Sequence, residues 1–278
     1  MPKVSVIVPN YNHAPYLEQR LASILNQTFT DFELIFLDDS SQDNSVSVAE
    51  TFRHDPRFVH LEVNERNSGS TFIQWEKGIS LAKGEYLWLA ESDDTAEPGF
   101  LAAMVKALDQ NKDYDVAYTS SIWIDDKDQE IHRPPHEKGD AYLLGKYLVQ
   151  KEFLQGPVIY NASSAVFRKP NHIDFNLLKT FKYTGDWLFW VMMAGPSGII
   201  RLDLRHNRFR RHENNVSFRS EREGLLFSEG FRVMDYIYSH YPVSWWNKRI
   251  NALRWAKRIG DFREGIPAEV RFYNRFLK

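Results

Sequence analysis

The first 125 residues alternate between short apolar runs and amphipathic stretches, and this alternation restricts the possible folds more than any other feature. Runs with the length and β-branched content of strands buried on both faces occupy residues 3–8, 32–37, 58–63, 85–90 and 115–123. Helical patterns lie between them, at about 15–26, 43–53, 71–83 and 98–110. This order predicts an α/β protein with an open, mostly parallel central sheet flanked by helices.

The second half of the chain is less regular. Residues 125–140 are polar and proline-rich, which predicts a loop. Helical patterns cover 141–154 and 185–194, and strand patterns cover 163–168 and 198–205. From about Glu221 onward the pattern is helical and rich in aromatic and basic residues. A chain of 278 residues, 43% of them hydrophobic, can form one large domain, alone or with an appendage.

Charge and composition exclude several classes of function. The net charge of −2 gives no overall attraction to nucleic acid, and the absence of cysteine excludes disulfides, thiolate catalysis and cysteine-bound zinc. A chain without cysteine fits a reducing compartment. We see no secretory signal, and the longest apolar run, 187–194, is far short of a membrane span. We therefore expect a protein that is soluble or at most peripheral to a membrane.

Three polar clusters follow predicted strands: 9–12 (Pro-Asn-Tyr-Asn), 38–41 (Asp-Asp-Ser-Ser) and 91–94 (Glu-Ser-Asp-Asp). Ligands of parallel sheets bind beyond the carboxyl ends of the strands, so we expect all three to open on one crevice. Each acidic cluster alone is typical of a solvated turn. Two of them at neighbouring strand ends would crowd negative charge, which a cation or a donor-rich ligand would compensate.

No glycine-rich phosphate-binding motif follows the first predicted strand. Neither G-x-G-x-x-G nor G-x-x-x-x-G-K-[ST] occurs there, so a nucleotide would need another counter-charge for its phosphates. A divalent cation held by carboxylates is the expected substitute.

Several spaced motifs, in the same order, resemble family 2 glycosyltransferases of the GT-A fold. They lie at 3–12 (KVSVIVPNYN), 25–29 (LNQTF), 31–34 (DFEL), 38–40 (DDS), 67–69 (NSG), 74–75 (QW), 78–86 (GISLAKGEY) and 93–94 (DD). The similarity is close over residues 3–125 and continues in pieces to about 217. It implies a metal-dependent, inverting transfer of a sugar from a nucleotide-diphosphate donor, expected to be a UDP-sugar, to a glycan hydroxyl in cell-surface polysaccharide synthesis.

The resemblance also implies roles for individual residues. It places Pro9, Asn10 and Tyr11 in the wall of the uracil and ribose pocket and makes Asp39 the acceptor for the uracil N–H. It places Asp93 near the ribose hydroxyls and assigns metal binding to Asp94, the aspartate of the D-x-D motif. Further expected nucleotide-binding residues are Asp38, Asn67, Gly69 and Arg211. The chain departs from the common family pattern at Glu76, where many members have Asn, and at Glu91, where many have Asp.

The segment 208–217 (RFRRHENNVS) reads from its residues alone as a basic surface loop. The resemblance places it near the diphosphate, where Arg210 or Arg211 could pair with phosphate oxygens. His212 could complete the coordination of the expected Mn²⁺ or Mg²⁺, and a nitrogen ligand would favour Mn²⁺.

Asp186 begins an apolar helical pattern, and its position alone favours a helix N-cap. The resemblance assigns it the role of catalytic base, in a Gly-Asp-x-x-Phe-Trp context. A carboxylate beside a sugar hydroxyl can take its proton during attack.

The same resemblance divides the chain into a GT-A catalytic domain, 1–220, and a C-terminal helical extension, 221–278. The catalytic domain would comprise a nucleotide-binding half, 1–125, and an acceptor-binding half, 126–220. In the extension, 245–249 (WWNKR) and 253–258 (LRWAKR) interleave aromatic and basic residues.

Two interpretations of this aromatic-basic segment stay open. It could be a helical cap packed on the catalytic domain, or an amphipathic helix on anionic lipid near a lipid-linked acceptor. RNA binding has no accompanying motif. We expect a cytoplasmic protein, at most peripheral at the inner face of the cell membrane, with a nucleotide-sugar donor and a glycan or lipid-linked glycan acceptor.

Two other classes of function remain as alternatives. A nucleotide-sugar pyrophosphorylase shares the architecture but opens with a glycine-rich, basic loop after its first strand, which residues 9–12 do not form. A non-catalytic nucleotide-binding or scaffold protein would keep Asp39 but tolerate the loss of Asp186.

Overall fold

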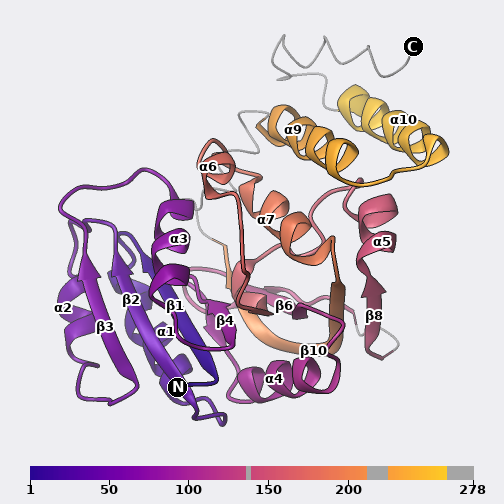
Figure 1. Ribbon diagram of the computed structural model, residues 1–278. Helices are drawn as coiled ribbons and strands as arrows, with labels where there is room; N and C mark the ends of the chain where they lie inside the picture. Colours follow the sequence, from indigo (N-terminus) through magenta and orange to yellow (C-terminus); the bar gives the residue numbers. More distant parts are fainter. Residues whose placement is uncertain (136–138, 212–224, 262–278) are drawn as a thin grey trace.

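The computed structural model describes residues 1–135, 139–211 and 225–261. Within these ranges ten strands form one sheet in the order β3-β2-β1-β4-β9-β6-β10-β5, with β7 on β6 and β8 on β10 (Figure 1). The strands are β1 (Val4–Asn10), β2 (Phe32–Asp38), β3 (Phe58–Val63), β4 (Tyr86–Leu89), β5 (Thr95–Ala96), β6 (Val116–Ile124), β7 (Glu130–His132), β8 (Ala141–Leu144), β9 (Ala165–Arg168) and β10 (Gly198–Arg210).

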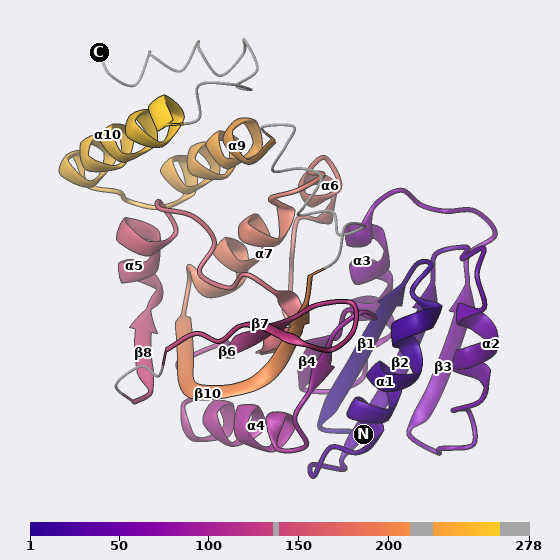
Figure 2. The same ribbon diagram turned by 180° about the vertical axis from the view of Figure 1, so that it is seen from behind.

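Helices cover both faces of this sheet (Figures 1 and 2). They are α1 (Ala14–Leu25), α2 (Ser45–Glu50), α3 (Thr71–Leu81), α4 (Phe100–Gln110), α5 (Gly145–Tyr147), α6 (Phe175–Leu178), α7 (Gly185–Ala194), α9 (Leu225–His240) and α10 (Trp245–Asp261). A π-helical turn spans Leu148–Glu152 and a 3₁₀ turn spans Ala162–Ser164. None of the helices in the described ranges is long and apolar enough to cross a membrane.

The predicted α/β class is confirmed. Strands β3, β2, β1 and β4 are parallel neighbours, and β6 and β10 are also parallel to each other. Strand β9 lies antiparallel between β4 and β6, so it joins the two parallel parts of the sheet. The carboxyl ends of β1, β2 and β4 therefore meet at one edge, as the alternation predicts.

Side chains of the central strands alternate between two cores, because successive residues of a strand point to opposite faces. From β1, Val6 and Val8 enter the core that α1 and α4 cover, whereas Ile7 enters the core formed with α3 and α7. This burial on both faces explains why the strands read as nearly continuous apolar runs.

The helices α9 and α10 stack on α7 and α5, on the side of the molecule opposite α4 (Figures 1 and 2). The Trp255 indole of α10 lies parallel to that of Trp187 of α7, with 6.2 Å between ring centroids and an interplanar angle of 5°. Gly230 of α9 lies between them, since a Cβ there would lie 3.1 Å from Trp255 and 3.2 Å from Trp187. The prediction of a helical C-terminal segment from 221 is confirmed for α9 and α10, between Leu225 and Asp261, and residues 221–224 lie outside the described residues. Its remainder, 262–278, lies outside the described residues.

Local patterns were wrong where distant pairing decides the structure. Residues 141–144, predicted helical, form β8, because they pair antiparallel with the start of β10. The predicted loop 125–140 contains β7, which pairs with β6. Strand β10 continues to Arg210, so Arg208 and Arg210 lie in a strand and not in the predicted surface loop. The division into 1–220 and 221–278 remains a prediction.

Candidate active site

Asp38 connects the end of β1 with the loop after β2 through hydrogen bonds. It is fully buried and accepts hydrogen bonds from Asn10 Nδ2, from the backbone N–H of Ser41 and from Ser41 Oγ, each at 2.7 Å. A buried carboxylate needs such donors to offset the loss of water. Asp38, predicted to bind nucleotide, thus faces the protein's own donors in this structure and positions the loops around it.

The two loops hold unusual backbone conformations. Asn12 and Ser40 have φ angles of 56° and 65°, which cost non-glycine residues free energy and are concentrated at functional sites. The backbone N–H of Asn12 donates to Ser41 Oγ at 2.9 Å, and Gln42 N–H donates to Asn12 Oδ1 at 2.7 Å. These two hydrogen bonds join the loops after β1 and β2. Tyr11, in the first of these loops, is 44% exposed, whereas Pro9 is buried in β1. The predicted pocket wall therefore lies at the strand end.

Asp39 organises the segment before α3. Its Oδ1 accepts from Asn64 Nδ2 at 2.7 Å, Ser68 N–H at 2.9 Å and Gln74 Nε2 at 2.8 Å, while its Oδ2 accepts from Ser68 Oγ at 2.8 Å. Oδ2 has one donor where Oδ1 has three, so Oδ2 retains a lone pair for a ligand N–H.

Asn67 and Gly69 lie beside this carboxylate. Asn67 Nδ2 donates to the Asp39 carbonyl oxygen at 3.2 Å, and its Oδ1 accepts from Gly69 N–H at 2.8 Å. Gly69 has a φ of +73°, which a side chain would strain. The predicted residues of this segment thus form one structural unit.

Burial disfavours the charged form of the acidic cluster after β4, and the neighbouring carboxylates add to this effect. Burial, aided by the charge of Asp93, raises the pKa of Asp94 to about 7 and that of Glu91 to about 8. Asp94 accepts from Asn161 Nδ2 at 2.8 Å and from the backbone N–H of Arg210 at 2.9 Å. Trp75 Nε1 donates to Glu91 Oε1 at 3.0 Å. The fold fixes these carboxylates in place before any cation compensates them.

Arg20 is a site residue that sequence reasoning missed. It is fully buried on α1, its guanidinium carbon lies 4.8 Å from the centroid of the Trp88 ring, and burial lowers its pKa to about 10. Its charge opposes the raised pKa of Asp94 and of Glu91. Its three nitrogens make no hydrogen bond within the described residues. The one indication in the sequence was that this arginine lies on the apolar stripe of the helical pattern at 15–26.

The carboxylates suit a hard cation, because oxygen ligands are those that Mg²⁺ and Mn²⁺ prefer. Among the described residues, no three side chains from His, Cys, Asp and Glu converge in a metal-binding arrangement. A cation at Asp94 would therefore draw further ligands from the donor diphosphate, from water or from outside those ranges. His212, the predicted nitrogen ligand, lies outside the described residues.

The two candidate phosphate-binding arginines differ. Arg210 is 1% exposed, and its guanidinium donates to the Asp93 carbonyl at 2.7 Å, the Asp125 carbonyl at 2.8 Å and Asp128 Oδ1 at 2.6 Å. These hydrogen bonds hold the end of β10 against the loop of Asp93, and they give the Arg210 side chain a structural role. Arg211 is half-buried with its guanidinium over the rings of Trp123 and Phe209, so it is the better candidate for contact with phosphate.

Asp186 lies in the first turn of α7, where Thr184 is the N-cap. The interpretation of Asp186 as the cap is therefore wrong. The residue is half-buried, its Oδ1 accepts from Trp187 N–H at 2.7 Å, and desolvation raises its pKa to about 7. A carboxylate with this pKa can act as a general base near neutral pH.

Glu229 of α9 holds the segment that leads into α7. It is 6% exposed and accepts from three consecutive backbone N–H groups, those of Lys182 at 2.7 Å, Tyr183 at 2.9 Å and Thr184 at 2.8 Å. Its charge further raises the pKa of Asp186. Sequence reasoning gave no sign of this residue, because the contact joins positions more than 40 residues apart, 229 and 184.

Helix α3 connects the separate parts of the candidate site. Gln74 donates to Asp39 and Trp75 donates to Glu91, so one turn of α3 contacts both acidic strand ends. The Trp75 ring also meets Phe189 of α7 edge-on, with 5.2 Å between centroids. At the start of α7, a Cβ on Gly185 would lie 2.4 Å from the Phe72 ring of α3. Helix α3 thus connects the predicted nucleotide-binding residues with the helix that carries Asp186.

Comparisons with known proteins place this arrangement in a family. The model of the family "Glycosyl transferase family 2" matches residues 5–173. The chain is 34% identical over 176 residues to glycosyltransferase GlyG of Streptococcus pneumoniae, covering 63% of this chain and 56% of that protein. It is 29% identical over 216 residues to the poly(ribitol-phosphate) beta-N-acetylglucosaminyltransferase TarP of Staphylococcus aureus, covering 74% of this chain and 62% of TarP. It therefore spans less than two thirds of either relative.

Among solved structures, S. aureus TarS (residues 1–349) in complex with UDP-GlcNAc superposes with a TM-score of 0.64 at 18% identity, covering 96% of this chain and 82% of TarS. This likeness concerns the fold. Together with the family match, it identifies the chain as a member of glycosyl transferase family 2 with the GT-A fold.

Proposed function

We propose that this protein transfers a sugar from a UDP-sugar to a hydroxyl group of a glycan, with inversion at the anomeric carbon. The observation that carries the proposal is the attachment of both acidic strand ends and of the Asp186 helix to α3, through Gln74, Trp75 and Phe72. Membership of family 2 supplies the reaction class.

The donor would bind along the edge formed by β1, β2 and β4. Asp39 Oδ2 accepts the uracil N–H, and Asp93 faces the ribose hydroxyls. Pro9, Asn10, Tyr11, Asn67 and Gly69 shape the pocket, Asp38 positions its loops, and Arg211 pairs with phosphate. The solved complex of TarS with UDP-GlcNAc supports a uridine donor.

Asp94 would hold Mn²⁺ or Mg²⁺, with His212 as a nitrogen ligand. When bound, the cation stabilises the negative charge that develops on the departing diphosphate. The raised pKa of Asp94 supports this role, because it reports a buried carboxylate without enough counter-charge.

Asp186 would act as the general base. It takes the proton of the acceptor hydroxyl while the acceptor oxygen forms its bond to the anomeric carbon. The bond from that carbon to the diphosphate breaks, and its electron pair leaves with UDP. A single displacement inverts the anomeric carbon, and holding both substrates in line supplies much of the acceleration.

The acceptor would be a glycan of a cell-surface polysaccharide, free or lipid-linked. TarP, named as a poly(ribitol-phosphate) beta-N-acetylglucosaminyltransferase, supports a polymer as the class of acceptor. We place the activity in the cytoplasm, at the inner face of the membrane, where a lipid-linked acceptor would be met. We assign residues 1–220 to the catalytic domain and 221–278 to an extension that contributes to it.

Titration calorimetry of UDP with and without Mn²⁺, beside a mass-spectrometric screen of nucleotide sugars for hydrolysis, tests the proposal. The expected result is metal-dependent UDP binding and turnover of one donor, lost in Asp186→Asn. Binding without turnover of any donor would favour the scaffold alternative. Formation of a nucleotide sugar and pyrophosphate from a nucleoside triphosphate and a sugar 1-phosphate would favour the pyrophosphorylase.

A further inference from the structure

Helix α10 carries a second apolar face that no described part of the chain covers. Its inner face is buried, with Asn251 at 3% and Trp255 at 2% exposure. On the outer face, Trp246 is 69%, Ile250 45% and Leu253 64% exposed. Spacings of four and three residues place these three side chains in one stripe. An exposed stripe of large apolar side chains indicates a binding surface.

Basic residues border the stripe on both sides. Successive residues of an α-helix are rotated by about 100° around its axis. This rotation places Arg249 on one side of the line from Trp246 to Leu253 and Arg254 on the other side. Lys257 follows Leu253 by one helical turn. The helix has five Lys or Arg residues and one Asp in its sequence, WWNKRINALRWAKRIGD. An apolar centre with a basic border is the pattern of a helix that lies in a membrane interface.

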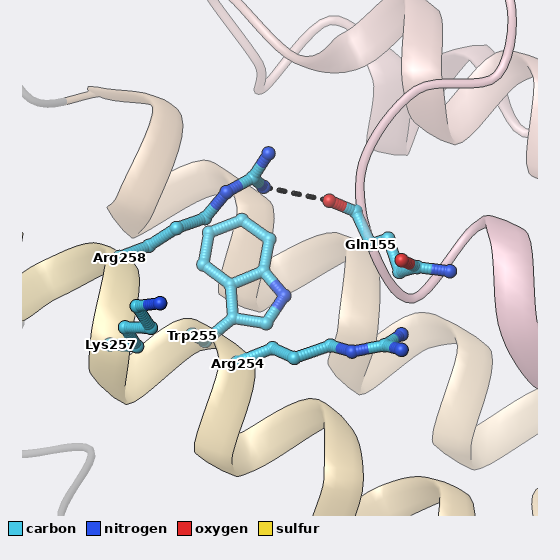
Figure 3. Close-up of a pocket in the computed structure, with 5 residues that line it drawn as sticks. All are labelled: Gln155, Arg254, Trp255, Lys257 and Arg258. Atoms are coloured by element: carbon cyan, nitrogen blue, oxygen red, sulfur yellow. Dashed lines mark hydrogen bonds between the residues drawn. The ribbon is translucent and has the colours of Figure 1, made fainter.

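A basic pocket opens beside the stripe (Figure 3). It has a volume of about 280 Å³ and is lined by Gln155, Arg254, Trp255, Lys257 and Arg258. Arg258 Nη1 donates to the Gln155 carbonyl at 2.7 Å, and Trp255 Nε1 donates to the Leu154 carbonyl at 2.9 Å, which fixes the wall. Figure 3 shows the Arg254 and Arg258 side chains on either side of the indole. Three cations around one cavity repel each other unless an anion binds there.

We propose that the outer face of α10 binds the surface of an anionic lipid bilayer. Trp246, Ile250 and Leu253 enter the interface, and the pocket cations Arg254, Lys257 and Arg258 neutralise lipid phosphates. A second copy of the chain fits less well, because a two-fold contact through this face would set its arginines against each other.

The biological role of this membrane binding rests on the proposed function, because a lipid-linked acceptor lies at the membrane surface. The inner face of the same helix stacks Trp255 on Trp187, the residue after Asp186. A bilayer bound to the outer face would therefore lie close to the helix of the proposed base.

Co-sedimentation of the full chain with lipid vesicles tests the proposal. We expect binding to phosphatidylcholine vesicles that contain phosphatidylglycerol, little binding to phosphatidylcholine alone, and weakening with added salt. Replacing Arg254 and Lys257 with Gln should weaken binding about 30-fold, from the loss of two basic residues. Replacing Trp246, Ile250 and Leu253 with Ser should weaken it by at least about tenfold.

The matched control is Lys106→Gln with Lys112→Gln, which removes the same charge from exposed positions in and just after α4, at the far side of the molecule. It should bind vesicles like the unchanged protein. Equal binding by all variants, or binding that depends on the cations alone and is displaced by inorganic phosphate, would overturn the proposal. A dimer in sedimentation velocity that the Ser variant abolishes would also overturn it.

Donor hydrolysis by the same samples separates this inference from the proposed function. Each α10 variant should hydrolyse the donor at the unchanged rate, because the replaced side chains face outward. Vesicle binding without hydrolysis by any sample would reject the enzyme and leave the lipid-binding surface standing.

Discussion

Replacing Glu229 with Gln should destabilise the protein by a predictable amount and shift the pH dependence of transfer. One carboxylate oxygen of Glu229 accepts from Lys182 N–H at 2.7 Å, and the other accepts from Tyr183 N–H at 2.9 Å and Thr184 N–H at 2.8 Å. Glutamine has a single acceptor oxygen. If that oxygen keeps the bonds to Tyr183 and Thr184, the new amide group faces the N–H of Lys182, and that bond is lost.

The size of the expected destabilisation follows from the burial of Glu229. Glu229 is 6% exposed, and a hydrogen bond to a charged group contributes about 1.5–3 kcal/mol. We therefore expect the free energy of unfolding to fall by about 2 kcal/mol. Glu50→Gln on α2 is the matched control, because Glu50 is 48% exposed and its 3.4 Å ion pair with Arg53 lies at the surface. That change should alter the free energy by less than about 0.5 kcal/mol.

The pH profile distinguishes a role at the base from a purely structural one. The Glu229 charge helps to raise the pKa of Asp186, so its removal should lower that pKa, although burial keeps it above the ordinary value. A base acts in its deprotonated form, and activity is lost as the pH falls through its pKa. The acidic limb of kcat/KM should therefore move to lower pH in Glu229→Gln and stay in place in Glu50→Gln.

Urea unfolding and a kcat/KM profile from about pH 5 to pH 9 measure both effects. An unchanged free energy of unfolding would refute the structural reasoning. An acidic limb that does not move, in a variant that is destabilised as expected, would refute the electrostatic link between Glu229 and Asp186.

Three further changes test other parts of the site. Asp94→Asn should abolish the effect of Mn²⁺ on UDP affinity, measured by calorimetry; a preserved metal effect would place the cation elsewhere. Measured above the pKa of Asp94, Arg20→Met should tighten Mn²⁺ binding several-fold, because it removes a buried positive charge that repels the metal, and weaker binding at that pH would contradict this reasoning. Asp186→Asn should lower kcat by about 10²–10⁴ with the Kd for UDP unchanged, and a parallel loss of UDP affinity would make Asp186 a structural residue.

The first half of the fold could be predicted from the sequence because its signals are local. The strand at 58–63 and the helix core at 71–81 follow directly from apolar periodicity, and both occur in the structure. The meeting of the ends of β1 and β2 at Asn10 and Asp38 also followed from a general property of parallel sheets, whereas a shared crevice stays a prediction.

The rest depends on contacts between distant segments. Residues 141–144 are a strand because β10 pairs with them, and Arg210 is a structural residue because the loop around Asp125 and Asp128 surrounds it. Arg20 and Glu229 belong to patterns that are typical of ordinary amphipathic helices. Their places beneath the acidic cluster and before α7 follow from packing, which periodicity does not encode.

A crystal structure with UDP and Mn²⁺ tests most directly whether the acidic strand ends and Asp186 share one site. We expect the uracil N–H on Asp39, the cation on Asp94 between protein and diphosphate, and the Asp186 carboxylate facing the space beyond the terminal phosphate. A nucleotide bound away from Asp39, or Asp186 directed into a region separate from the diphosphate, would contradict this expectation.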